Sequence, residues 1–535
     1  MRKLDLLFCL SVVLAMNCWP ANVAASPNIL LIVADDLGYA DLGVFGSDIR
    51  TPSIDAIAAN GMVFTDFHTS PSCQPTRAML MSGNNNHVAG VGRQHRSPLI
   101  TMAVDGFEGH LSDRVVPFPV LLQQAGYRTY MAGKWHLGDE PEQGPHASGF
   151  DRSFSLIHGA GAHFSGTGLF PGGSLYRMDG KEVEFPNGGY STELFTDRLI
   201  EFIDADREAG RPFFAYAAYT APHWPLQVPD DYLNLYAGQY EQGYDQLRAE
   251  RLDSLKAAGI IPREAELPPR NDAIAPWDSL SADAQRKESR KMELYAAMVE
   301  NLDHHVGRLV QYLQANDLYE NTLIVFMSDN GAAGEDYYYY GPIKQYLQSH
   351  YSDRYEDMGR AGSWISYGPQ WAEAGSAPFS RYKTYATEGG IVTPMLIAGP
   401  GVVEGITHRS YTTVMDLAPT FLALADQTYP SDGSVNPMLG ESLLPVLTGD
   451  ASAAHSEDYV TTLYYEGRAF IRQSHWKLVN VEPPFSESAF RLHDLSVDPG
   501  ETVDLRASNP QKHQQLLELW RKTRRELGIL LPVDL

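Results

Sequence analysis

The stretch "NILLIVADD", Asn28–Asp36, decides the fold: a nearly continuous apolar run ends abruptly in two carboxylates. An uninterrupted run of this kind is typical of a strand that helices bury on both faces. Similar runs recur along the chain, at Tyr127–Gly138, Pro212–Pro225, Asn321–Gly331 and Thr393–Gly401. The sequence therefore predicts an α/β fold with a large mixed, mainly parallel sheet sandwiched by helices.

Amphipathic segments between these runs predict the helices. One segment, Leu294–Leu313, places apolar side chains on a single helical face, namely Leu294, Met298, Leu302, Val306, Leu309 and Leu313. A second predicted helix is Thr412–Ala425. From about residue 451 the pattern changes to short antiparallel strands, followed by an amphipathic helix within Pro510–Leu527.

We therefore expect a catalytic domain over residues 26–450 and a small C-terminal domain, with an antiparallel sheet and a terminal helix, over residues 451–535. The 535 residues, 44% of them apolar, are enough for one large core or two unequal ones.

The charge of the chain excludes several classes of partner. Lys and Arg number 41 against 66 Asp and Glu, a formal net charge of −25. Binding to nucleic acid or to an anionic membrane needs a basic face, so neither is expected. An anionic substrate would have to be held by a local cationic pocket.

The N-terminus has the pattern of a secretory signal peptide over residues 1–25. Arg2 and Lys3 precede the apolar run Leu6–Met16, which is too short to span a bilayer, and cleavage is expected after Ala25. An uncleaved anchor is the alternative. We expect an exported protein, periplasmic or secreted, with no stable membrane anchor.

Polar side chains follow two of the apolar runs directly: Asp35 and Asp36 after the first, and Asp329 and Asn330 after the fourth. Ligands of open α/β sheets bind at the carboxyl ends of the strands. Three carboxylates and an amide meeting there would repel one another unless a hard cation bound them, calcium first and magnesium second. Either pair alone could instead serve a turn or a helix cap.

Cationic and imidazole side chains follow other predicted strands. Lys134 and His136 are two residues apart, which puts them on one side of an extended segment, while His223 lies in a proline-rich loop and Lys383 precedes two glycines. Any one of them alone would be structural or solvated. Together they would form a pocket for a tetrahedral oxyanion.

Cys73 is the only cysteine outside residues 1–25, so no disulfide can form within the mature chain. Pro75 favours the first turn of a helix that Gly83 ends, which puts Cys73 at a helix N-terminus. Arg77 lies one turn along and could reach back to it. As a thiol, Cys73 would then have a lowered pKa.

The segment "CQPTRAMLMSG" resembles the Cys-x-Pro-x-Arg signature of the formylglycine-dependent type I sulfatases of the alkaline phosphatase superfamily. Further motifs agree in their order along the chain: "ADDLGYADLG", "GKWHLG", "APHWP", "SDNGA", "TEGG", "TVMDLAPT" and "LHDLSVDPGE". The chain is most similar to the Pseudomonas-type bacterial arylsulfatases, which share "GNNNHVAGVG" and the aromatic insertion before Lys383.

The resemblance implies an alkaline phosphatase-like fold and the hydrolysis of sulfate monoesters. It implies that a formylglycine-generating enzyme converts Cys73 to formylglycine on the nascent chain. Calcium would be bound by Asp35, Asp36, Asp329, Asn330 and the modified Cys73. The diol would be held by Arg77, Lys134 and His136, and the sulfate by Lys134, His223 and Lys383. Thr76 and Asn84 depart from the common pattern without touching the Cys, Pro and Arg positions.

The implied mechanism begins with a formylglycine gem-diol hydroxyl that attacks sulfur with Asp329 as base. Calcium, Lys134 and Lys383 offset the charge on the sulfonyl oxygens. His223 protonates the leaving alcohol or phenol, and His136 takes the proton of the second hydroxyl.

Three other functions are compatible with some of these features. A phosphonate monoester or phosphodiester hydrolase of the same superfamily could use the same pocket. An unmodified calcium-dependent binding protein would not need the acid and the base, and a thiol hydrolase would not need the four oxygen ligands. The aromatic insertion contains Tyr337–Tyr340, Trp364 and Trp371. It could bind an aryl or steroid sulfate, or it could be a packing surface. Sulfated sugars are a further possible class of substrate.

Overall fold

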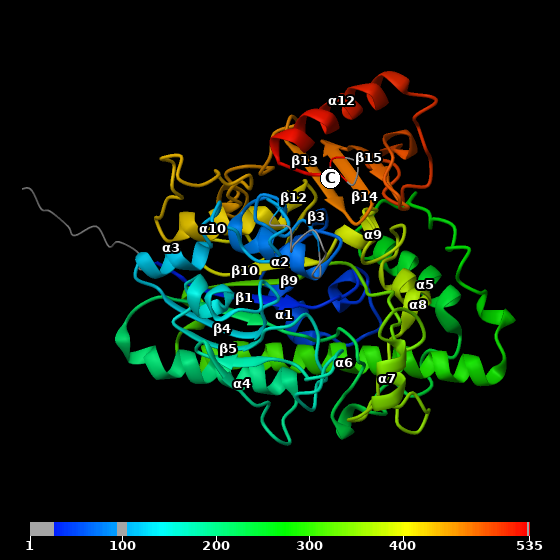
Figure 1. Cartoon of the computed structure of the whole chain (residues 1–535), viewed down its shortest axis with the longest axis horizontal. Coiled ribbons are helices and arrows are strands. Elements are labelled where there is room, and N and C mark those ends of the chain that lie inside the picture. The colour runs from blue at the N-terminus through cyan, green and yellow to red at the C-terminus, as the bar shows by residue number, and fades with distance from the viewer. Residues whose placement is uncertain (1–25, 94–103, 532–533, 535) are drawn as a thin grey trace, which may run out of the picture.

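The computed structural model describes residues 26–93, 104–531 and 534 (Figure 1). The expected signal peptide, residues 1–25, lies outside the described residues. Within the described part, none of the helices combines the length and the apolar character needed to cross a bilayer.

A ten-stranded mixed sheet forms the centre of the molecule. In spatial order its strands are β11 (Ile406–His408), β2 (Gly61–Phe64), β10 (Met395–Ala398), β9 (Thr322–Ser328), β1 (Asn28–Ala34), β8 (Phe213–Ala218), β4 (Arg128–Lys134), β5 (Arg152–Leu156), β6 (Tyr176–Met178) and β7 (Lys181–Val183). The five strands from β9 to β5 are parallel, whereas β10, β6 and β7 run antiparallel to their neighbours. The predicted mainly parallel sheet is confirmed.

Helices cover both faces of this sheet. The helices on one side are α1 (Pro52–Ala59), α4 (Ser191–Asp206) and α6 (Ala282–Ala315), and those on the other are α2 (Cys73–Ser82), α3 (Phe118–Gln124) and α10 (Leu417–Leu424) (Figure 1). The apolar face predicted for residues 294–313 is buried in α6. The other described helices of the large part are α5 (Gly243–Ala257), α7 (Lys344–His350), α8 (Gly368–Gly375), α9 (Glu388–Ile391) and α11 (Leu444–Leu447).

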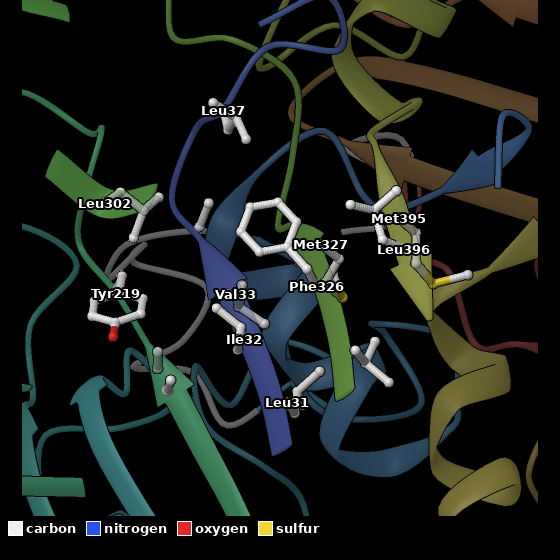
Figure 2. Packing of buried hydrophobic residues seen from close by; sticks show 14 of the residues in the cluster. Leu31, Ile32, Val33, Leu37, Tyr219, Leu302, Phe326, Met327, Met395 and Leu396 are labelled. Carbon is white, nitrogen blue, oxygen red and sulfur yellow. The ribbon is translucent and has the colours of Figure 1, made fainter. Parts of the chain in front are cut away.

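The core is built around β1, every residue of which is buried. Figure 2 shows Ile32 and Val33 of β1 beside Phe326 of β9, with Tyr219 and Met395 in the same cluster. Because helices cover both faces of the sheet, a continuous apolar run is more stable here than an alternating one.

One predicted helix is shorter than expected. Thr412 and Thr413 form the short strand β12 against β3 (Phe67–His68), and a single 3-10 turn follows before α10 begins at Leu417. The side chains of Thr413 and Asp416 form a reciprocal capping box across that turn, which ends the extended segment and starts the helix.

The C-terminal part contains the predicted antiparallel sheet, in the order β13 (Val460–Tyr465), β14 (Arg468–Gln473), β15 (Trp476–Asn480) and β16 (Arg491–Asp494). The terminal helix α12 (Pro510–Glu526) covers this sheet (Figure 1). Side chains alternate between two environments. Phe470 and Val479 join the main core, whereas Ile471 and Leu478 lie in a separate cluster under α12.

Candidate active site

The carboxyl ends of β1 and β9 place two pairs of polar residues side by side. The parallel register pairs Ala34 with Ser328, so Asp35 and Asp329 leave the sheet next to each other. Asp36 takes a left-handed conformation, with φ of +66°, and its N–H donates to Asp329 Oδ1 at 3.2 Å. All three carboxylates are buried.

Asn330 completes this oxygen-rich cluster. Its Nδ2 donates to Asp36 Oδ1 at 2.6 Å, while its Oδ1 is buried and has no hydrogen-bond partner among the described residues. Ligand atoms of Asp35, Asp36, Cys73 and His223 lie within 4.8 Å of one another. A buried orphaned oxygen beside converging carboxylates fits a hard divalent cation such as calcium or magnesium.

Cys73 lies against this cluster at the first position of α2. Ser72 is the extended residue before the helix, and Gly83, with φ of +63°, ends it as predicted. The Cys73 Sγ donates to Asp36 Oδ1 at 3.6 Å, and the residue is 1% exposed.

The expected low pKa of the Cys73 thiol is wrong for this environment. Burial raises the pKa well above its usual value, and Asp329 and Asp36 add to the rise although Lys134 and Lys383 oppose it. The helix N-terminus would lower the pKa of the thiol, but burial and the neighbouring carboxylates raise it by more. A free thiolate nucleophile is disfavoured here.

Arg77 fixes Asp329 instead of turning back to Cys73 as the spacing suggested. Its Nε and Nη2 donate to Asp329 Oδ2 at 3.0 and 2.7 Å. Its Nη1 donates to the carbonyl of Lys134 at 2.8 Å and to the hydroxyl of Tyr216 at 3.3 Å. Burial alone would lower the pKa of Arg77, but Tyr216 and Asp329 raise it, so the guanidinium stays charged.

Two buried lysines bind the two carboxylates that follow β1. Lys134, the last residue of β4, donates to both oxygens of Asp35 at 2.9 and 2.7 Å. Lys383 donates to Asp36 Oδ2 at 2.8 Å, and its Nζ lies 3.8 Å from Glu335 Oε1. The cationic groups predicted from separate strand ends therefore converge on one point.

His223 faces the same cluster from the loop after β8. Its Nδ1 lies 2.6 Å from the carbonyl oxygen of Trp224 and donates to it, which leaves Nε2 directed at Asp36 Oδ2, 3.4 Å away. Burial lowers the pKa of His223 well below its usual value, although Asp36 opposes the shift. The imidazole is therefore neutral around pH 7 in the free protein.

His136 departs from the expected geometry. Because β4 ends at Lys134 and His136 takes φ of +59°, the two side chains do not follow the alternation of an extended strand. The His136 residue is half-buried, and its ring lies against Gly159, where an added Cβ would be 2.5 Å from the imidazole.

Two residues near the cluster, Tyr216 and Glu335, were not predicted from the sequence. Tyr216 contacts Arg77 from the middle of β8. Its place within an apolar run makes it look like an ordinary core residue in the sequence. Glu335 lies in the loop after Asn330, inside the aromatic insertion and two residues before the predicted Tyr337. Glu335 was detectable in principle because it lies five residues beyond a predicted ligand, although the adjacent Asp336 gives the sequence no way to choose between the two carboxylates.

Most of the insertion serves packing. Trp364 and Trp371 are completely buried, and Trp371 lies in edge-to-face contact with Tyr244 and Trp277. Tyr337 and Trp364 both contact Trp224, next to His223, with ring centroids 5.3 and 5.7 Å apart, and of these two only Tyr337 is partly exposed.

Two family models match the chain. The model described as Sulfatase matches residues 27–427. The model described as N-sulphoglucosamine sulphohydrolase, C-terminal, matches residues 381–527.

Known proteins of similar sequence and structure agree with these matches. The chain is 38% identical to an uncharacterized sulfatase of Schizosaccharomyces pombe, over 95% of both chains. It is 37% identical to an arylsulfatase of Klebsiella aerogenes, over 83% of this chain and 96% of the relative. Among solved structures, Ps i-CgsB in complex with k-i-k-neocarrahexaose has a TM-score of 0.66 and 26% identity, covering 94% of this chain and 93% of that one.

Proposed function

The chain belongs to the sulfatase family and is a sulfuric ester hydrolase, and from this premise we propose that it works with formylglycine made from Cys73 and with a bound calcium ion. The observation that carries the proposal is the convergence of Cys73, the carboxylates after β1 and β9, and the buried lysines on one point. A thiol hydrolase that used Cys73 would need none of these oxygen ligands.

The calcium ion would be held by Asp35, Asp36, Asp329, Asn330 and the residue 73 side chain. The orphaned Oδ1 of Asn330 supports this ligand set, and the absence of sulfur-rich or multi-histidine ligation among the described site residues disfavours zinc. When bound, calcium supplies positive charge that stabilises a nucleophilic oxygen and the sulfonyl oxygens.

The formylglycine of residue 73, once hydrated, supplies a hydroxyl nucleophile that an unmodified thiol cannot provide. We assign Asp329 as the base for that hydroxyl. Arg77 donates to its Oδ2, which orients the carboxylate, while its Oδ1 accepts the N–H of Asp36. Arg77 thereby acts as a positioning residue for the base.

The sulfate would be bound by Lys134, Lys383 and His223. In the free protein Lys134 and Lys383 neutralise Asp35 and Asp36, so binding of a cation at the carboxylates leaves both ammonium groups available for sulfate oxygens. His223 Nε2 would gain a proton in the presence of the anionic substrate and donate it to the leaving oxygen. We assign the second proton transfer, from the diol, to His136.

The substrate is proposed to be an aryl or glycan sulfate monoester. The Klebsiella relative is named an arylsulfatase, and Trp224 with Tyr337 offers an aromatic surface beside His223. One similar solved structure is a complex with a neocarrahexaose, which supports a glycan sulfate as the other substrate class.

Three further proposals concern the maturation of the protein, its location and its domain boundary. A formylglycine-generating enzyme modifies the nascent chain, the protein is exported to the periplasm or medium after loss of residues 1–25, and the catalytic and C-terminal parts meet near residue 450.

The test is hydrolysis by protein co-produced with a formylglycine-generating enzyme. We expect 4-nitrophenyl sulfate to be hydrolysed at least about 100-fold faster, by kcat/KM, than 4-nitrophenyl phenylphosphonate, and calcium chelation to remove the activity. A matched Cys73→Ser variant should be folded and inactive. Faster hydrolysis of the phosphonate would instead support the phosphonate monoester hydrolase alternative.

A further inference from the structure

Glu335 adds a carboxylate to the site that the calcium ligands and the sulfate-binding groups do not require. It lies in the loop after β9, and its Oε1 is 3.8 Å from Lys383 Nζ. Its other oxygen, Oε2, is buried and has no hydrogen-bond partner among the described residues. A buried acceptor beside a substrate-binding lysine can bind a donor that arrives with the substrate.

The position of Glu335 is on the outer side of the sulfate-binding groups. Its side chain is 18% exposed, whereas that of Lys383 is 2% exposed, although the two are in contact. Of these two contacting side chains, the carboxylate is therefore the one nearer to solvent.

Ring contacts connect this loop to the leaving-group side. Tyr337, two residues after Glu335, meets Trp224 edge-to-face at 5.3 Å. The Trp224 ring lies 4.1 Å from that of His223, the proposed acid for the leaving oxygen. Burial raises the pKa of Tyr337 to about 12, and Glu335 adds to this rise, as expected for neighbours.

Charge decides what Glu335 does to the leaving group. Burial raises the pKa of Glu335, but Lys383 opposes the rise. The ion pair with Lys383 favours the carboxylate form. A second negative charge on the substrate would be repelled by the carboxylate at short range, and because the Glu335 side chain is 18% exposed, salt would weaken this repulsion.

We propose that Glu335 is a specificity-determining residue that selects sulfate monoesters with an uncharged leaving group and rejects those with a second anionic group close to the ester. Its Oε2 accepts a hydrogen bond from a hydroxyl or amide N–H of the leaving group. The inference rests on the proposed function, because it takes the sulfate to lie between Lys134, Lys383 and His223.

The test compares two substrates of similar shape, 3-carbamoylphenyl sulfate and 3-carboxyphenyl sulfate, with formylglycine-containing enzyme. The wild-type protein should prefer the carbamoyl compound at least about 10-fold in kcat/KM, and this preference should fall as salt is raised. The Glu335→Gln variant keeps an acceptor oxygen but loses the charge. It should gain about 10-fold on the carboxy compound, mainly through KM, and stay within about 3-fold on the carbamoyl compound.

Glu356→Gln is the matched control, since it removes the same charge from the same insertion at an exposed residue paired with Arg354. It should leave the substrate ratio unchanged. An unchanged ratio in Glu335→Gln, or a wild-type ratio near one, would overturn the inference while hydrolysis of both sulfates upheld the proposed function. Failure of the wild-type protein to hydrolyse either sulfate would overturn both. Because the net charge of −25 also disfavours a dianionic substrate, a second variant, Glu335→Ala, replaces Glu335→Gln if the latter does not fold, and it should show the same gain on the carboxy compound.

Discussion

Asp36 is the residue on which the charges of the site are balanced. Lys383, Asn330 and the Cys73 thiol all donate to its carboxylate, and His223 lies 3.4 Å away. Although burial alone would raise the pKa of Asp36, the charged Lys383 holds it well below its usual range. The residue therefore stays ionised and ready to bind a cation.

Asp35 behaves differently, and this predicts a pH-dependent calcium affinity. Burial raises the pKa of Asp35 to about 7, although Lys134 opposes the shift, and Asp329 and Asp36 add to it. Below that pH calcium must displace a proton from Asp35, whereas above it the carboxylate is already ionised. The Kd for calcium should therefore rise, by up to about tenfold per pH unit, as the pH falls below about 7.

Calorimetric titration of the metal-free protein at about pH 6 and about pH 8, in buffers of different ionisation enthalpy, measures both the affinity and the proton release. The release should approach one proton per ion at the lower pH. Equal affinities at the two pH values would contradict the assignment of Asp35 as the titrating ligand.

At this scale the sequence predicted which residues gather but not how they pair. Asp35 and Asp329 were predictable because parallel strands end at one edge of a sheet. Arg77 binds Asp329 because of how far its side chain extends in three dimensions. The pKa of Cys73 is raised because segments distant in sequence enclose the thiol. Spacing along one helix carries no information on either.

Among the elements, α2 holds the nucleophile, and its C-terminal end depends on Gly83. This glycine has φ of +63°, and an added Cβ would lie 2.9 Å from Met438 Sδ. Gly210 has the same φ of +63° but nothing within 4 Å of such a Cβ, so it is a matched control.

We expect Gly210→Ala to lower the free energy of unfolding by about 1 kcal/mol, the cost of the left-handed conformation alone. Gly83→Ala should cost about 2–3 kcal/mol because Met438 must also move. Denaturant titration of both variants gives the difference. Equal losses in the two would show that the contact with Met438 has no energetic weight.

Elements with a strong apolar period were predictable, and those set by local side-chain bonds were not. The buried face of α6 follows from its sequence, because its apolar residues recur every three or four positions. The start of α10 at Leu417 depends on the Thr413–Asp416 capping box, which an apolar pattern does not reveal. The break after Lys134, which redirects His136, likewise has no signal in hydrophobicity.

In the whole molecule, a buried ionic network joins the C-terminal sheet to α9 and to the short strand β3 of the large part. Lys477 of β15 lies 2.6 Å from Glu388 Oε1 and 2.9 Å from Glu501 Oε1. Glu388 also contacts His68 at 2.8 Å, and Arg472 lies 3.0 Å from the same imidazole. Since Glu388 is five residues after Lys383, the network also supports the segment that carries a sulfate-binding lysine.

Loss of one member of this network should destabilise the whole protein. Lys477→Met leaves Glu388 and Glu501 buried without their shared cation and should cost about 3–5 kcal/mol of the free energy of unfolding. Arg521→Met, which removes an exposed partner of Glu487, should cost less than about 1 kcal/mol.

Thermal and denaturant unfolding of both variants, followed by far-UV circular dichroism, measures these losses. We expect one cooperative transition, because Phe470 and Val479 of the C-terminal sheet belong to the main core. A Lys477→Met variant as stable as the wild type, or a separate transition of the C-terminal part, would contradict the network's role.

The most direct test of the account is the mass of the peptide that contains Cys73, taken from protein that hydrolyses 4-nitrophenyl sulfate. Conversion of the thiol to formylglycine lowers the mass by about 18 Da, an outcome outside the ordinary oxidation products of cysteine, and the peptide should react with an aldehyde probe. Activity should rise in proportion to the converted fraction and should be absent from the thiol form. Full activity in protein whose Cys73 is an unmodified thiol would contradict it.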